Sequence, residues 1–172
     1  MNKREFISTA AMLGACGMLS AKEKKRYEAG ATSGSVFNVK EFGAKGDGKT
    51  SDSEAIQKAL DAAGAVSGSV YFPSGVYMCH DLKARAHTTL LAEPQWAYRG
   101  EGGAILSLDS ETASCVLDIT GAFGVHIRGL FFRGIRNASK TIHGIFLNND
   151  KEYSKQEDTI VIDDCKVQHF SG

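Results

Sequence analysis

The stretch with the strongest chemical signal, by residue type and spacing, is 43–50, which reads GAKGDGKT. It satisfies the GxxxxGK[ST] pattern, in which backbone N–H groups cradle the phosphates of a nucleotide and the lysine reaches the outer phosphates. In this interpretation Lys49 would be the phosphate-binding lysine. The pattern therefore raises nucleotide hydrolysis as one function to weigh.

The surroundings of this loop do not supply the context that phosphate binding requires. Such a loop follows a buried strand, opens a helix and precedes alternating strands and helices. Val39–Phe42 does not have the composition of a buried strand, and Asp47 and Asp52 would place carboxylates where phosphate needs N–H dipoles. Although Ile160–Asp163 is similar to the metal-binding strand of nucleotide hydrolases, no second helix is predicted. We therefore expect a structural loop and keep a P-loop nucleotide hydrolase as the remote alternative.

One amphipathic helix is predicted after the loop, over about residues 52–63. Ser51 as N-cap and Glu54 three residues later form a capping box. Gly64 and Gly68 are expected to end the helix. The apolar stripe has the spacing of one narrow buried face and consists of Ile56, Ala59, Leu60 and Ala63.

Short strands with alternating apolar residues make up the rest of the chain. Val70–Phe72 and Val76–Met78 are separated by Pro73-Ser74-Gly75, which predicts a tight hairpin. From Leu82 to Phe170 the sequence shows short alternating runs and little helical period. The sequence thus predicts an all-β domain that has a single helix near its start.

Two of the later strand pairs repeat at a constant offset of 35 residues (160 − 125 and 167 − 132). A fixed-offset repeat of two strands that meet at a corner is typical of a solenoid coil. The polar stretches 136–143 and 149–158 are predicted to be inserted loops that lengthen the coil. The matching pairs are Val125 with Ile160, Ile127 with Ile162, Leu130 with Cys165 and Phe132 with Val167.

The alternation within these strands also predicts which side chains face outward. The offset stacks Arg128 on Asp163 and Arg133 on Gln168. Stacked exterior pairs of this kind are usually solvated and contribute little stability, and sugar binding is the alternative. The apolar residues of the repeat face inward, and the outward set consists of His126, Arg128, Arg133, Asp163, Lys166 and Gln168.

Four features occur together within residues 36–79. They are the FGAKGDG loop, the Thr/Asp cluster at Thr50–Ser53, the AIQKAL segment of the helix, and a strand followed by Pro-x-Gly-x-Tyr. In this combination the stretch resembles the N-terminal region of the pectin-lyase-like, right-handed parallel β-helix proteins. It most resembles the pectate lyase superfamily domain shared by rhamnogalacturonases, epimerase-like proteins and phage tailspikes. The resemblance implies an incomplete β-helix over residues 36–172, with the helix as a cap on its N-terminal end.

The resemblance further implies the processing of a uronate-containing polysaccharide. Hydrolysis would need paired carboxylates, and elimination would need a base and a cation, often calcium. Because neighbours along a strand face opposite sides, Asp163 and Asp164 are not expected to share a substrate, and Asp164 is expected at a corner. The candidates for catalysis are Asp163, Asp164 and His143, and those for substrate binding are Arg128, Arg133 and Asp163.

These residues do not form a complete catalytic set. A polysaccharide lyase, a glycoside hydrolase and a non-catalytic carbohydrate-binding, adhesin-like or tailspike-like β-helix all stay open. No spacing of metal ligands is present, and calcium is expected only for a lyase. The sequence stops directly after an apolar strand pair, where Val167 and Phe170 would lack a covering coil. We therefore expect the N-terminal portion of a longer protein, which in isolation is marginally stable and inactive.

Composition and charge narrow the range of partners. The chain has 20 Lys+Arg and 20 Asp+Glu, so its zero net charge gives no reason to expect nucleic acid. Its 42% hydrophobic and 23% charged content is that of a soluble globular protein. Cys79, Cys115 and Cys165 lie among apolar residues and far apart in sequence, which predicts buried free thiols.

The first residues have the pattern of an export signal. Residues 1–21 combine a basic start with an apolar stretch that is too short for a membrane span. Asn2–Ile7 resembles a twin-arginine signal in which Lys3 takes the first arginine position. Leu13–Cys16 resembles a lipobox, which makes Cys16 a candidate for lipidation and a lipid anchor; a plain cleaved signal is the alternative. Residues 22–35 predict a flexible linker, and the protein is expected in the cell envelope, periplasmic or lipid-anchored, or secreted.

Overall fold

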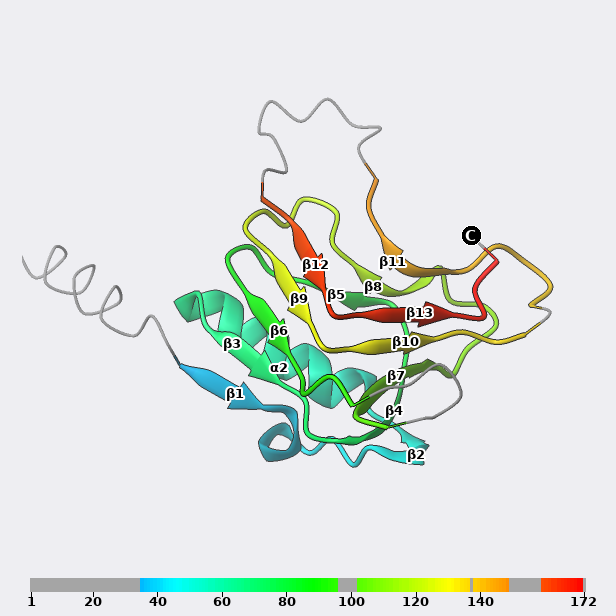
Figure 1. Cartoon of the computed structure of the whole chain (residues 1–172), viewed down its shortest axis with the longest axis horizontal. Helices are drawn as coiled ribbons and strands as arrows, with labels where there is room; N and C mark the ends of the chain where they lie inside the picture. The colour runs from blue at the N-terminus through cyan, green and yellow to red at the C-terminus, as the bar shows by residue number, and fades with distance from the viewer. Residues whose placement is uncertain (1–34, 96–101, 137, 149–158, 172) are drawn as a thin grey trace, which may run out of the picture. The chain divides into compact units, whose positions relative to one another are not determined.

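The computed structural model describes residues 35–95, 102–136, 138–148 and 159–171. Within these ranges the strands pair in parallel and form three sheets (Figure 1). Sheet A has the order β1 (Val36–Asn38), β3 (Ser69–Tyr71), β6 (Thr89–Leu91), β9 (His126–Arg128), β12 (Val161–Asp163). Sheet B has the order β13 (Lys166–Gln168), β10 (Phe131–Arg133), β7 (Ala104–Leu108), β4 (Gly75–Cys79), β2 (Asp47–Ser51). Sheet C has the order β11 (His143–Phe146), β8 (Cys115–Asp118), β5 (Leu82–Lys83).

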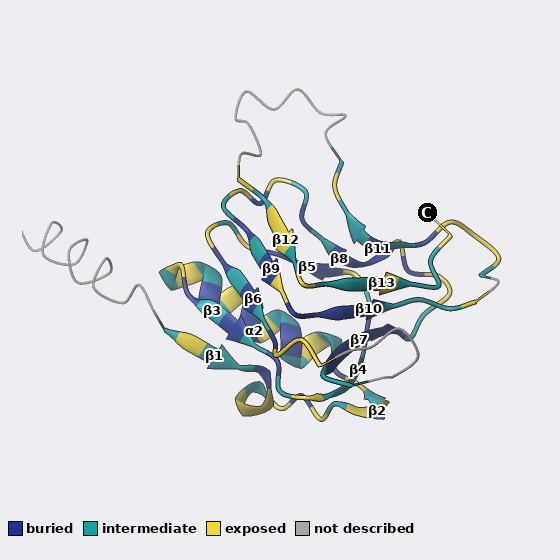
Figure 2. Cartoon of the chain, in the orientation of Figure 1, coloured by how far each residue is buried: buried dark blue, intermediate teal, exposed yellow. Residues whose placement is uncertain are grey.

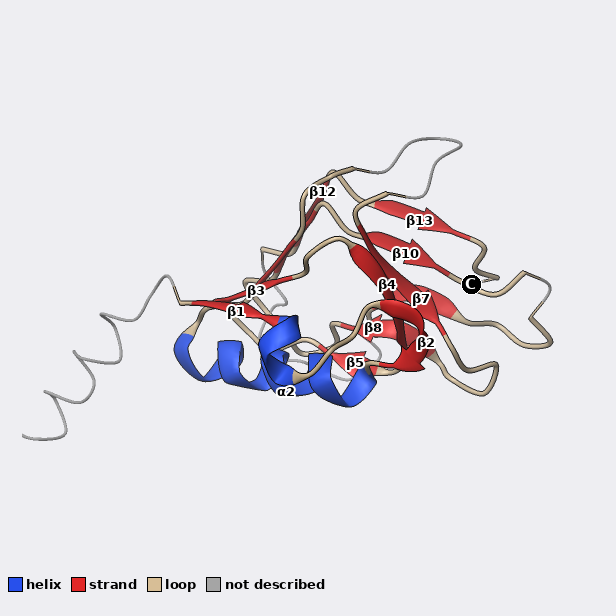
Figure 3. Cartoon of the chain, turned by 90° about the horizontal axis from the view of Figure 1, so that it is seen from below, coloured by secondary structure: helices blue, strands red, loops and turns tan. Residues whose placement is uncertain are grey.

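From β6 onward the chain visits sheets A, B and C in turn and then returns to sheet A. The coil β6–β7–β8 is followed by the coil β9–β10–β11, and each strand of the second pairs in parallel with its equivalent in the first. Figure 3 shows sheets A and B as separate layers, with the helix beneath sheet A. This arrangement confirms the predicted right-handed parallel β-helix.

The 35-residue repeat is a repeat of coils, as predicted. Ile127 lies opposite Ile162 in sheet A, and Phe132 lies opposite Val167 in sheet B. The corners repeat as well, because Gly129 (φ +75°) and Asp164 (φ +48°) occupy the same left-handed position in successive coils. The repeat therefore includes the backbone turns and not the apolar side chains alone.

The interior of the coils contains the apolar side chains that alternation predicted (Figure 2). The four residues of the earlier coil are fully buried: Val125, Ile127, Leu130 and Phe132. In the last described strands, Ile162 is 46% exposed and Val167 is 54% exposed. Burial of the predicted inward residues is thus complete in the β9–β10 coil and partial in β12 and β13.

The helix α2 (Ser53–Val66) and its N-cap residue each lie one residue later than predicted. Asp52, not Ser51, is the N-cap residue, and Glu54 forms an ion pair with Lys58 at 2.7 Å instead of reaching back to the cap. The predicted capping box is therefore wrong. The prediction fails because Ser51 belongs to strand β2, where it lies opposite Met78 of β4.

The helix also continues through Gly64 to Val66, and Ser67 with φ +53° is its C-cap residue. The N–H of Gly68 then donates to the carbonyl of Ala63 at 2.9 Å. Position 64 within the helix is occupied by glycine because a Cβ atom there would overlap the side chain of Arg85. Gly64 therefore indicates close packing of the helix against the segment after β5. The prediction that Gly64 ends the helix is wrong.

The apolar stripe of α2 covers the N-terminal end of the solenoid. All four residues that the spacing predicted are fully buried: Ile56, Ala59, Leu60 and Ala63. They belong to the same apolar cluster as Val70 and Leu90 of sheet A. The helix packs on β1, β3 and β5, so the predicted capping role is confirmed.

The predicted hairpin is wrong. Strand β3 lies in sheet A and β4 lies in sheet B, so Pro73-Ser74-Gly75 turns a corner between two sheets. The corner is filled by Phe72 and Tyr77, whose ring centres are 5.9 Å apart. The Tyr77 hydroxyl donates to the carbonyl of Pro73 at 2.7 Å, and burial raises the pKa of Tyr77. A hairpin and a solenoid corner share the same strand–turn–strand signal, and only the pairing partners of each strand distinguish them.

The three cysteines of the described ranges are free thiols, as predicted. Cys79 and Cys115 are buried, and Cys165 is half-buried. Burial raises the pKa of Cys115 to about 12. The predicted signal at 1–21, Cys16 and the linker up to residue 34 lie outside the described residues. In the described part of the chain, no helix has the length and apolar character needed to cross a membrane.

Candidate functional site

The glycine loop that matched the phosphate-binding pattern is held by an internal carboxylate. Asp52 is only 2% exposed and accepts hydrogen bonds from the N–H groups of Lys45 (2.6 Å) and Gly46 (2.9 Å). Before the loop, Val39–Phe42 forms a 3-10 helix and not a buried strand. The N–H groups that a phosphate would need are thus directed at a carboxylate, and the loop is a structural turn.

A second aspartate closes the other half of the loop. Asp47 accepts hydrogen bonds from the N–H groups of Lys49 (2.9 Å) and Thr50 (2.8 Å) and from the Thr50 hydroxyl (3.0 Å). These donors, first the Thr50 N–H and then the Lys49 N–H, lower the pKa of Asp47 to about 2 from its ordinary value of 3.8. Lys49 itself is exposed.

The lowered pKa predicts an acid-sensitive contribution to stability. Because the pKa is lower in the folded state, the ionised form of Asp47 stabilises the fold above pH 3.8, and this contribution is lost as the pH falls through about 2. The Asp47→Asn variant should therefore lose less stability than the parent chain across this interval. Urea unfolding midpoints of both proteins at several pH values would test this. Equal losses of stability would contradict the assignment.

The candidate site residues of the sequence lie on three different sheets. Arg128 and Asp163 are on sheet A, Arg133 is on sheet B, and His143 is on sheet C. Asp164 occupies the corner between β12 and β13, as predicted. The structure therefore brings the sheet A residues together and separates them from Arg133 and His143.

The sheet A residues form one charged cluster with Arg128 at its centre. The Arg128 guanidinium lies 3.7 Å from an Asp163 oxygen and 3.5 Å from an Asp164 oxygen. His126 Nε2 lies 3.2 Å from the other Asp163 oxygen. The expectation that the two aspartates point apart is wrong, because the left-handed backbone of Asp164 turns its side chain toward the same arginine. All four side chains are 42–51% exposed, so these ion pairs contribute little stability.

The outer face of sheet B carries the other predicted basic residue. Arg133 Nε donates to the Ser107 hydroxyl at 3.2 Å, and Arg133 lies opposite Gln168 as predicted. Next to them the Lys166 ammonium lies over the Phe131 ring, 4.4 Å from its centre. This face therefore presents cationic and amide groups on a buried apolar support.

His143 lies apart from both groups. It begins β11, lies opposite Cys115 in sheet C, and has its ring centre 5.1 Å from that of Phe146. No carboxylate of the candidate set shares its sheet. Asp163, Asp164 and His143 thus do not form one catalytic constellation.

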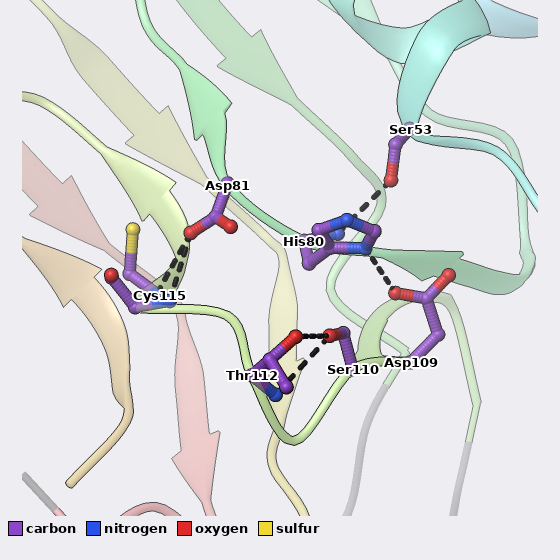
Figure 4. Close-up of polar contacts among 8 residues, drawn as sticks. Ser53, His80, Asp81, Asp109, Ser110, Thr112 and Cys115 are labelled. Carbon is purple, nitrogen blue, oxygen red and sulfur yellow. Dashed lines mark hydrogen bonds and ion pairs between the residues drawn. The ribbon is translucent and has the colours of Figure 1, made fainter.

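The structure reveals one pair that sequence reasoning missed. His80 Nδ1 lies 2.6 Å from an Asp109 oxygen, and the His80 N–H donates to the Ser53 hydroxyl at 3.1 Å (Figure 4). Cys79 of β4 lies opposite Leu108 of β7, so the next residues of the two strands meet at the same corner. The 29-residue offset between these strands (108 − 79) was the signal that could have found the pair.

This His–Asp pair has part of the geometry of a catalytic base. A carboxylate on one imidazole nitrogen can orient the ring for proton transfer by the other. Ser53, however, accepts from the backbone of His80 and not from its ring, so no Ser-His-Asp triad forms. Among the residues that the structure describes, no three His, Cys, Asp or Glu side chains are placed to hold a metal ion. The pair links the start of α2 to the first two coils.

Comparison with known proteins identifies the N-terminal part of the chain. Residues 36–98 match the family model of "Rhamnogalacturonase A/epimerase, pectate lyase-like". Residues 36–98 are a pectate lyase-like domain. The predicted resemblance over residues 36–79 is thereby confirmed, and the match extends through β6.

Solved structures extend the likeness beyond residues 36–98. The A-module of mannuronan C-5 epimerase AlgE6 from Azotobacter vinelandii aligns with a TM-score of 0.63 at 26% identity, over 79% of this chain and 38% of the module. The AlgE4 A-module aligns with a TM-score of 0.60 at 26% identity, over 79% of this chain and 39% of the module. The β-helix described here is therefore related to the epimerase modules.

Curated relatives match shorter stretches of the chain. Alginate lyase 7 of Azotobacter vinelandii is 67% identical over 42 residues, which are 24% of this chain and 5% of that protein. Plasmin and fibronectin-binding protein A of Streptococcus pneumoniae is 44% identical over 72 residues, 39% of this chain and 9% of that protein. The matched chain thus spans a small part of these curated relatives and under two fifths of the epimerase modules.

Proposed function

We propose that this chain belongs to a β-helix module that acts on a uronate polymer of the alginate class. The observation that carries the proposal is the alignment with the AlgE6 A-module over 79% of the chain. The 67% identity to alginate lyase 7 over 42 residues supports the same class of polymer. Epimerisation and elimination of such a polymer share their first step, removal of the proton next to the carboxylate.

Within such a module, we propose that the described residues bind the polymer and support the fold but do not catalyse the reaction. Proton removal next to a carboxylate needs a base and a cation on the same uronate unit. The carboxylates of Asp163 and Asp164 both contact Arg128, and His143 is on another sheet. Calcium, which a lyase could use to neutralise the uronate carboxylate, does not fit the described residues, since they group no three metal ligands. No step is assigned to it.

The test uses the whole chain and polymannuronate. Calorimetry would measure binding, ultraviolet absorbance would report unsaturated ends made by a lyase, and NMR would report conversion of mannuronate to guluronate. We expect binding without either product, and no binding to a neutral mannan of similar length. Product formation would contradict the non-catalytic role, and failure to bind polymannuronate would contradict the uronate assignment.

A second candidate is an adhesin-like function in which the β-helix binds a host protein. The observation that favours it is the match to plasmin and fibronectin-binding protein A, which is longer than the match to alginate lyase 7. Immobilised fibronectin and plasmin, presented to the whole chain beside polymannuronate, would separate the two candidates. Saturable binding to either protein without binding to the polymer would favour the adhesin.

We also propose that the protein is exported to the cell envelope or secreted, with Cys16 as the site of a lipid anchor. The proposal is supported by the signal-like pattern of residues 1–21, and a uronate polymer outside the cell would be a fitting substrate. Fractionation of expressing cells, followed by mass spectrometry of the mature N-terminus, would find either a diacylated cysteine or a plain cleaved end. Retention of Met1 in the cytoplasm would contradict export.

A further inference from the structure

We propose that a cavity between two successive corners of the solenoid is a subsite for one uronate unit, an inference that rests on the proposed function. The cavity has a volume of about 310 Å³ and is lined by residues that follow β10 and β13, where the chain leaves sheet B. Its lining consists of Ile135, Arg136, Ala138, His169, Phe170 and Ser171.

The two turns are held together by backbone contacts. The N–H of Gly134 donates to the carbonyl of Gln168 at 2.8 Å. A Cβ atom on Gly134 would overlap the His169 carbonyl, so only glycine permits this approach. His169 has φ +65°, which turns its side chain out of the strand direction at the end of β13. The cavity wall is therefore built on a fixed backbone.

Arg136 is oriented toward the cavity by a histidine. His169 Nε2 accepts a hydrogen bond from Arg136 Nε at 3.0 Å and lies 2.9 Å from the amide nitrogen of Gln168. The single lone pair of His169 Nε2 is engaged by the Arg136 N–H and is therefore not directed at an anionic ligand. The contact engages Nε of Arg136 and leaves the two terminal nitrogens for a ligand. A carboxylate can then take two parallel N–H···O bonds.

The rest of the lining suits a sugar ring. Ile135, Ala138 and Phe170 are half-buried and present apolar surface. The Ser171 hydroxyl is fixed, because it donates to the Lys140 carbonyl at 3.0 Å and accepts from the Ile142 N–H at 3.1 Å. Apolar surface next to a few convergent polar groups is typical of small-molecule sites.

Charge and size select the ligand class. The lining contains the guanidinium of Arg136 and no carboxylate, which favours an anionic ligand. A volume of about 310 Å³ is at the lower end of ligand cavities and suits one pyranose unit better than a longer stretch of polymer. A uronate unit combines the ring face and the carboxylate that the two sides of the cavity require.

The experiment compares Arg136→Gln with a matched control in the full chain. The control is Arg85→Gln, because Arg85 is also an exposed arginine with an aspartate partner, Asp61, but is not part of the cavity lining. Calorimetry with a mannuronate tetramer should show about tenfold weaker binding for Arg136→Gln and unchanged binding for Arg85→Gln, the effect expected from loss of a charge-assisted bidentate contact. A neutral mannose tetramer should bind neither protein.

A second readout does not depend on substitution. Titration of the unsubstituted chain with the mannuronate tetramer should change the methyl chemical shifts of Ile135 and Ala138 by more than those of Ile127. Equal binding by Arg136→Gln and the unsubstituted chain, or shifts confined to other sheets, would overturn the subsite and leave the proposed function standing. No binding of polymannuronate or tetramer by the unsubstituted chain would overturn both.

Discussion

The Asp52→Ala variant is expected to lose about 3 kcal/mol of unfolding free energy, because two backbone N–H donors would lose their charged, buried acceptor. These donors are the N–H groups of Lys45 and Gly46, at 2.6 and 2.9 Å from the carboxylate oxygens. Asp52 is also the residue at which α2 begins, so its loss would loosen the glycine loop and the cap together. Urea unfolding followed by circular dichroism would measure the effect.

Two control variants separate the carboxylate from the general fragility of the loop. Asp52→Asn keeps one oxygen acceptor and should lose an intermediate amount of stability. Lys49→Ala changes an exposed side chain of the same loop and should change the unfolding free energy by less than about 0.5 kcal/mol. If Asp52→Ala unfolds at the same urea concentration as Lys49→Ala, the buried carboxylate does not hold the cap.

The Gly129→Ala variant is expected to lose about 4 kcal/mol, the sum of left-handed strain and a backbone collision. Gly129 has φ +75°, and a Cβ atom there would overlap the carbonyl oxygen of Ala92 in the preceding coil. A backbone oxygen cannot move aside as a flexible side chain can. The collision should therefore separate two coils at the corner between sheets A and B.

Gly43→Ala is the matched control for the collision. Gly43 also has a left-handed backbone, with φ +100°, but a Cβ atom there would meet nothing within 4 Å. Its expected loss is that of strain alone, about 1–2 kcal/mol. Thermal and urea unfolding of the two variants would measure the difference. Similar losses for Gly43→Ala and Gly129→Ala would show that the coils can separate without cost at this corner.

Side-chain periodicity predicted the stacking of the coils and the buried face of the helix. The 35-residue offset predicted the stacking of Ile127 on Ile162 and of Arg128 on Asp163. The apolar stripe of α2 was predicted in full. Both depend on side-chain periodicity, which a parallel solenoid converts directly into burial and register.

The errors share one cause. The hairpin, the capping box and the Gly64 stop are local signals, and each was overridden by a contact with a distant segment. Strand β4 pairs with β7 and β2, Ser51 pairs with Met78, and Gly64 packs against Arg85. The shared contacts of Asp163 and Asp164 with Arg128, and the His80–Asp109 pair, arose in the same way. Their residues meet at corners, where strand alternation no longer predicts side-chain direction.

By itself the sequence determined the class of fold, the cap and the coil repeat of this protein, because these follow from periodic burial and from the short motifs of residues 36–79. Only the tertiary structure decided which corners turn between sheets, which charged residues meet, and where a cavity lies. Those features depend on the register between coils, which residues 20 to 37 positions apart establish when their strands pair. Local spacing carries no information about such pairs until the coils are stacked.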